Sequence, residues 1–188
     1  MSVIQLEADM SEKKAQTRER ILQAAASAML QHGPQEPGVA DVMGAAGLTV
    51  GGFYAHFACK DALMLEVFEQ LLRKRRDLMA LIDQSLPGAE RRALAAGFYL
   101  SRKHRDATRS GCPLPSSLSA MAQLPGAYRE LLVGHLEVLS ARMCDSPEEV
   151  DMALADIALM VGGLALARAL GEGDLSDRVL RAAKSAVI

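Results

Sequence analysis

Apolar residues recur at helical spacing along nearly the whole chain, and glycine and proline divide this pattern into segments. The first segment ends at Gly33-Pro34 and carries apolar residues at positions 21, 22, 25, 28 and 29. Aromatic residues make up only 4% of the sequence and tryptophan is absent, so the core must be built from Ala, Leu, Val and Met. That composition favours helices over sheets, and the sequence therefore predicts an all-α fold.

We expect about nine helices and no strand. Their expected ranges are 11–33, 39–47, 50–57, 60–87, 89–102, 112–124, 128–143, 147–171 and 175–187. Ser11 marks the expected start of the first helix, and Thr49 is the expected cap of the third. Ser146 begins a Ser-Pro-Glu-Glu run, which predicts a capping box with proline at the first helical position.

The length of 188 residues allows one full domain and a small second one. No uninterrupted apolar stretch is long enough for a membrane span, and the N-terminus lacks a cationic start followed by an apolar run. We therefore expect a soluble, cytoplasmic protein without a membrane partner. Cys59, Cys112 and Cys144 lie far apart without zinc-ligand spacing, so we expect free thiols and no metal or other cofactor.

Charge alone does not indicate a nucleic-acid partner. The net charge of the chain is −2, and residues 11–60 carry a balance of only +1. A DNA-binding function must therefore be argued from a motif.

Three predicted helices with a glycine-containing turn between the second and third give the layout of a helix-turn-helix. The residues that sharpen this pattern are TRERILQAA at 17–25, AAGLT at 45–49, FYAHF at 53–57 and KDAL at 60–63. Over about residues 14–63 the sequence closely resembles the TetR family of bacterial transcriptional regulators.

This resemblance implies a DNA-binding domain over residues 11–60 and a ligand-binding and dimerisation domain over residues 61–188. It further implies that four residues face base edges and that three others hold phosphates. The first group is Thr49, Val50, Gly51 and Gly52, and the second is Tyr54, His56 and Lys60. A phenol, an imidazole and an ammonium are all suitable phosphate donors, whereas the first group offers few polar atoms, so we expect DNA shape to contribute to recognition.

The resemblance also implies an effector pocket between the central helices of the second domain. Our candidates combine aromatic, thiol and thioether surface suited to a small apolar ligand. They are Phe98, Cys112, Met121 and Met160. We expect a homodimer through 147–171 and 175–187, where small residues including Gly162 allow close helix approach, and a palindromic operator.

The predicted function is a ligand-responsive DNA-binding regulator, a repressor that a small apolar molecule releases from its operator. One alternative is a thiol-based electrophile sensor, because Cys112 precedes a predicted helix start that would lower its pKa. A thiol enzyme with His104 as base and an interaction module are two more hypotheses, but the sequence contains no recognisable catalytic motif, so we expect no enzyme. Phe53 and Phe57 are expected in the core, and Arg73–Arg76 as a solvated collar.

Overall fold

The computed structural model describes residues 3–187, and every regular element in this part of the chain is helical. Nine α-helices and three 3-10 helices follow one another, which confirms the all-α prediction. The α-helices are α1 (Val3–His32), α2 (Val39–Ala45), α3 (Lys60–Ala80), α4 (Gly88–Tyr99), α5 (Arg102–Asp106), α6 (Leu114–Ser117), α7 (Gly126–Arg142), α8 (Val150–Leu170) and α9 (Asp174–Ala186). The 3-10 helices are η1 (Val50–Ala55), η2 (Leu118–Gln123) and η3 (Pro147–Glu149).

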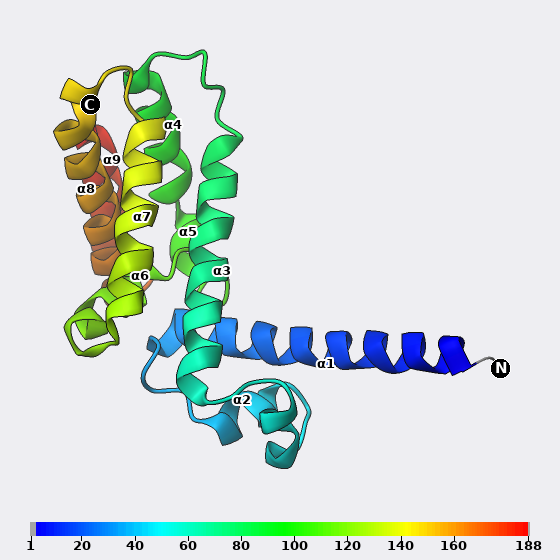
Figure 1. The fold of residues 1–188 in the computed structure, drawn as a ribbon. Helices are drawn as coiled ribbons and strands as arrows, with labels where there is room; N and C mark the ends of the chain where they lie inside the picture. The colour runs from blue at the N-terminus through cyan, green and yellow to red at the C-terminus, as the bar shows by residue number, and fades with distance from the viewer. Residues whose placement is uncertain (1–2, 188) are drawn as a thin grey trace.

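The N-terminal part forms a small three-element unit in which α1 lies across the start of α3, and α2 and η1 pack beneath it (Figure 1). Phe53 and Phe57 are 0% and 5% exposed, as predicted for core residues. They join Ile21 of α1 and Met43 of α2 in the buried cluster. The short helices are therefore held by a shared aromatic and aliphatic core.

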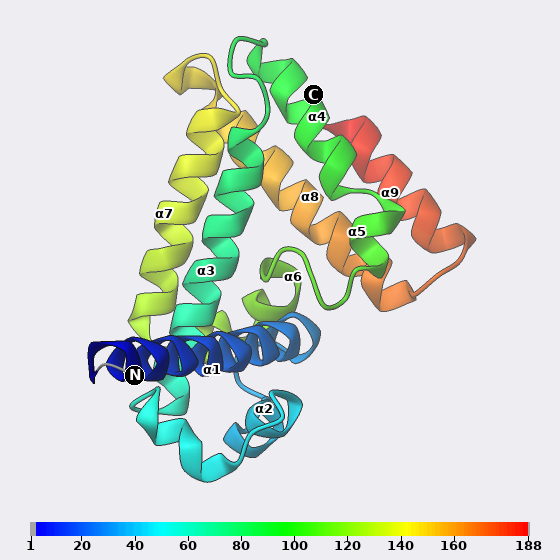
Figure 2. The same cartoon turned by 90° about the vertical axis from the view of Figure 1, so that its right-hand side faces the viewer.

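The remaining helices form a bundle around α3 and α8. Helix α3 runs beside α7, while α8 packs against α9 and α4, and α6 lies between these groups (Figure 2). A Cβ added at Gly163 of α8 would lie 2.8 Å from the Ala183 Cβ of α9 and 3.1 Å from a Leu100 methyl. The close packing of α8 inside the chain therefore depends on Gly163, whereas a Cβ added at Gly162 would meet no other helix within 4 Å in the described part of the chain.

The predicted start of the first helix is wrong, and so are two predicted capping interactions. Helix α1 begins at Val3 and continues through Ser11, so this serine is not a cap. Thr49 and Ser146 do occupy N-cap positions, but neither side chain accepts a capping hydrogen bond. The segments that follow them begin as 3-10 turns, and the low helix propensity of the glycines at 51–52 explains why η1 does not form an α-helix.

The predicted helix 89–102 ends three residues early and is followed by a separate short one. Leu100 has ψ 47, which interrupts the α-helix, and the Ser101 Oγ accepts a hydrogen bond from the His104 amide to begin α5. The buried face of α4 in its second half is made by small residues. Ala95 and Ala96 are buried, whereas Leu94 and Phe98 are 42% and 74% exposed.

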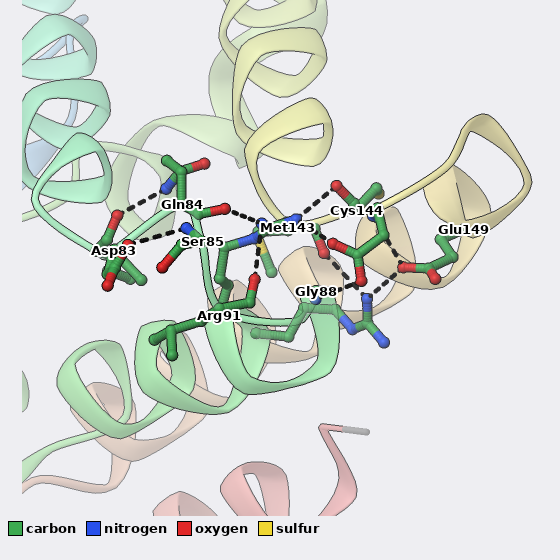
Figure 3. A network of polar contacts seen from close by, with 12 residues as sticks. Asp83, Gln84, Ser85, Gly88, Arg91, Met143, Cys144 and Glu149 are labelled. Carbon is green, nitrogen blue, oxygen red and sulfur yellow. Dashed lines mark hydrogen bonds and ion pairs between the residues drawn. The ribbon is translucent and has the colours of Figure 1, made fainter.

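Two buried arginines of α4 hold the connection between α7 and α8. Arg91 donates to the carbonyl oxygens of Gln84, Leu86 and Cys144 and pairs with Asp145 at 2.8 Å (Figure 3). Arg92 pairs with Glu149 at 3.1 Å and with Asp156 at 3.2 Å. These charges stay buried because each guanidinium has carboxylate partners.

Helix α8 is the most apolar element. With the preceding turn it spans residues 147–170, long and apolar enough by length and composition to cross a membrane, with a mean hydropathy of 1.8 in its most apolar window. Of that window, 44% is buried within the chain. Its packing against α9 and its buried Asp156 are typical of a core helix of a bundle.

Candidate DNA-binding site and effector region

The turn between α2 and η1 is closed by a glycine that the backbone requires. Gly47 has φ +67, and its amide donates to the Gly44 carbonyl at 2.9 Å. A Cβ at this position would also lie 3.1 Å from the guanidinium of Arg20. Arg20 of α1 donates to the Ala46 carbonyl at 2.6 Å and so satisfies the C-terminal end of α2.

A second arginine of α1 fixes this unit to α3. Both terminal nitrogens of Arg18 donate to the Glu66 carboxylate, at 2.7 and 2.5 Å. Its guanidinium also lies over the Phe57 ring, 4.6 Å from the centroid. Hydrogen bonding to Glu66 raises the pKa of Arg18, so the pair remains charged. The sequence did not predict either contact, because the partners of Arg18 and Arg20 do not lie at helical spacing from them.

The predicted base-facing residues lie together on an exposed edge. Thr49, Gly51 and Gly52 are exposed, and Val50 and Tyr54 are 47% and 72% exposed. Phe53, between them in sequence, is fully buried and packs edge-on against the Tyr54 ring at 5.3 Å. One side of η1 is therefore packed into the core through Phe53, and the other side is exposed to solvent.

The two other predicted phosphate donors are half-buried. The Lys60 ammonium donates to the Gln35 carbonyl at 2.7 Å, which ties the first turn of α3 to the loop before α2. The His56 Nδ1 is buried without a hydrogen-bond partner in the described part of the chain. At Gly38, the N-cap of α2, the amide donates to the Asp41 carboxylate at 3.1 Å, so this end is capped without a Ser or Thr.

The four predicted effector residues differ in burial, and Phe98 lies on the surface. Cys112, Met121 and Met160 are 2%, 7% and 5% exposed. Phe98 points outward from α4, because the buried arginines and alanines of that helix occupy its inner face. A groove of about 440 Å³ lies between α1, α6 and α8, and none of the four residues lines it.

Cys112 lies in a buried polar cluster. Its amide donates to the Nε2 of His104 at 3.3 Å, and the Nδ1 of the same ring bonds the Tyr99 carbonyl at 2.8 Å. One ring nitrogen therefore accepts and the other donates, as in a neutral imidazole. Burial lowers the pKa of His104 to about 4, which agrees with this tautomer.

The expectation of a lowered Cys112 pKa is wrong. Burial raises the pKa of this thiol, and contacts with Tyr99 and with nearby positive charges offset only part of that effect. Helix α6 has only four residues, so it offers the thiol little helix dipole. The three cysteines are free, with Cys59 exposed and Cys144 half-buried.

An exposed edge, a glycine turn and a bracing helix give the arrangement of a helix-turn-helix, a motif typical of DNA-binding proteins. Residues 21–67 match the family model described as "Bacterial regulatory proteins, tetR family". This match covers the helix-turn-helix and the first part of α3, so the N-terminal region of the chain is similar to that of the TetR family of transcriptional regulators.

Similar solved structures extend over nearly the whole chain. The reduced form of E. coli NemR has 20% identity and a TM-score of 0.76, covering 92% of this chain and 95% of that one. A TetR regulator from Chloroflexus aurantiacus has 23% identity and a TM-score of 0.75, covering 94% of each chain. A TetR-family regulator from Agrobacterium tumefaciens has 18% identity and a TM-score of 0.76, covering 92% and 97%. These similarities establish the fold, and no curated protein sequence matches the chain.

Proposed function

We propose that the protein is a dimeric repressor, released from a palindromic operator by a small, largely apolar molecule bound in its C-terminal domain. The observation that carries this proposal is the exposed edge of η1 on a buried Phe53 anchor. We assign DNA binding to residues 11–60 and effector binding and dimerisation to residues 61–188.

In this proposal Thr49, Val50 and the two following glycines meet base edges, and Tyr54, His56 and Lys60 meet phosphates. The Val50 side chain suits a thymine methyl, and glycine lets the backbone approach the groove closely. Lys60 retains donors for a phosphate beyond the one that it gives to Gln35.

The test is DNA binding at a series of salt concentrations. Lys60→Ala should weaken binding to all sequences and reduce the slope of log K against log salt by about one. Lys74→Ala is the matched control, because Lys74 is an exposed lysine farther along α3. Equal slopes for Lys60→Ala and the wild type would contradict this docking.

The dimer face that we propose lies on α8 and α9. Ala158 and Gly162 are exposed, one turn apart on α8, and Leu166 follows at the next turn with 60% exposure. Small residues beside an exposed leucine suit close packing against a second copy of the same helix. Of the other small residues predicted there, Ala153 is buried within the chain and Ala165 is half-buried.

The thiol-sensor alternative has less support. The buried Cys112 thiol with its raised pKa provides little thiolate at neutral pH. Ligand release therefore remains the function that we propose.

A further inference from the structure

Arg75 occupies the core-facing stripe of α3. Phe68, Leu72 and Met79 on the same helix are buried, and Arg75 continues their spacing of three and four residues. Its Nε is buried without a hydrogen-bond partner, and no ion pair joins Arg75 to a carboxylate within residues 3–187. An inward-facing arginine without a carboxylate is unusual, because a buried charge is costly unless it is paired.

Arginines that are more deeply buried than Arg75 show the usual arrangement. Arg91, Arg92 and Arg105 are 4–6% exposed, and each pairs with at least one carboxylate within 3.2 Å. The lack of a partner at Arg75 is therefore a local property of its site.

A second unpartnered polar group lies on the neighbouring helix. His135 of α7 is 0% exposed, and neither ring nitrogen has a hydrogen-bond partner in the described residues. Helices α3 and α7 run side by side in both views (Figures 1 and 2). Buried polar groups are satisfied in most proteins, so an unbonded imidazole on α7 and an unbonded Arg75 Nε on the adjoining helix α3 mark a site that a ligand can complete.

The charges that act on His135 are positive. Arg75 and Arg76 help to lower the pKa of His135 to about 4, after burial as the main cause. The charges of Arg75 and Arg168 likewise act to lower the pKa values of His104 and Cys112. No carboxylate contributes to the pKa shifts of His104, Cys112, His135 or Arg168.

We propose that the effector is an amphipathic anion, whose carboxylate or equivalent oxyanion pairs with Arg75 and accepts a hydrogen bond from His135, while its apolar body packs beside the core side chains of α3. This inference rests on the proposed function, since it takes the C-terminal domain as the effector site. An oxyanion would supply both the charge and the acceptor that these two groups lack.

A small-anion probe tests the site directly. Crystals of the full chain soaked in sodium bromide should show an anomalous peak at ion-pair distance from Arg75, and crystals of Arg75→Met should not. No peak at Arg75 in the wild type, or a peak that persists in the variant, would overturn the inference.

A set of matched ligands tests the chemical class. Benzoate, phenylacetate and hexanoate should include at least one acid that raises the melting temperature at up to about 10 mM, while its primary amide has no effect. Arg75→Met should weaken binding of that acid by about 10-fold to 100-fold, and Arg75→Lys should weaken it less. Equal stabilisation by acid and amide, or no stabilisation by any acid, would contradict an anionic effector.

Two controls separate binding from folding and from DNA binding. Arg75→Met without ligand should unfold at the same or a higher temperature than the wild type, because it removes an unpaired charge, whereas a purely structural arginine would give a loss. Arg73→Met, at an exposed position of α3, should retain acid binding. A wild-type chain that binds the anion at Arg75 but no DNA would overturn only the proposed function, whereas one that binds DNA but no anion would overturn only this inference.

Discussion

Acidification should destabilise the protein through its two buried histidines. The pKa values of His104 and His135 are lowered from 6.5 to about 4, mainly by burial. Nearby arginines lower both further, while the hydrogen bond to the Tyr99 carbonyl partly opposes the shift at His104. Because the unfolded chain has the higher pKa, it binds more protons between pH 6.5 and 4. The stabilisation is therefore complete above the unfolded pKa and is lost as the pH falls toward 4.

The size of this effect follows from the two pKa values. Lowering the pH from about 7 to 5 should cost about 2 kcal/mol for each histidine and about 4 kcal/mol for both. A domain of this kind is stable by about 5–15 kcal/mol, so the loss is a large share of the total.

Urea unfolding followed by circular dichroism at both pH values measures this loss, at one fixed protein concentration because a dimer dissociates on dilution. His135→Leu should remove about 2 kcal/mol of the pH-dependent loss and should not reduce stability at pH 7, since it removes an unsatisfied polar group. His32→Leu is the control, with an imidazole that is 58% exposed. Equal pH-dependent losses in the wild type and His135→Leu would refute the argument.

Further substitutions test the packing. Arg18→Met should cost about 1–3 kcal/mol in urea unfolding and weaken DNA binding, because it removes a bidentate ion pair and a ring contact; unchanged stability would contradict this. Gly163→Val should destabilise each protomer by about 1–3 kcal/mol, whereas Gly162→Leu should give folded monomers in sedimentation; a tight Gly162→Leu dimer would place the interface elsewhere. N-ethylmaleimide at neutral pH should label Cys59 faster than Cys112 by mass spectrometry, and the reverse order would revive the thiol sensor.

Local signals explain what the sequence could predict. Glycine and proline end helices by backbone geometry, so breaks at Gly33 and Gly47 appear in both the pattern and the structure. Phe53 and Phe57 were predictable as core residues, because their apolar rings have little else to contact in a short helix. The motif that contains them also carried the family resemblance.

Partners distant in sequence explain what it could not predict. Within the expected solvated collar Arg73–Arg76, Arg75 and Arg76 are half-buried, because α7 packs against that side of α3. Arg92 is buried in an ion pair with Asp156, which lies 64 positions later in the sequence. No local pattern encodes such a pair. The outward position of Phe98 has the same origin, since these arginines occupy the inner face of α4.

Helix α3 gives the proposed effector site a physical connection to the DNA-binding unit. Its first turn holds the loop before α2 through Lys60, Glu66 pairs with Arg18 of α1, and Arg75 follows about 14 Å farther along the same continuous helix. A ligand that draws the Arg75 segment toward α7 must therefore move or rotate the end that carries η1. In a twofold dimer, small displacements of this kind change the distance between recognition edges, and a coupling of about 1–3 kcal/mol changes operator affinity about 5- to 150-fold.

A second contact links the same two parts. The Ser116 hydroxyl of α6 donates to the Met29 carbonyl of α1 at 3.0 Å, and Gly33 lies against the Ser116 carbonyl with φ +78. A Cβ at Gly33 would lie 2.6 Å from that oxygen, so the two backbones are packed too closely for any side chain at position 33. Because packed interfaces of this kind shift between discrete arrangements, α1 must follow α6 when α6 moves. An effector between α3 and α7 whose binding also shifts α6 would then act on the DNA-binding unit at two points, which favours its movement as one body.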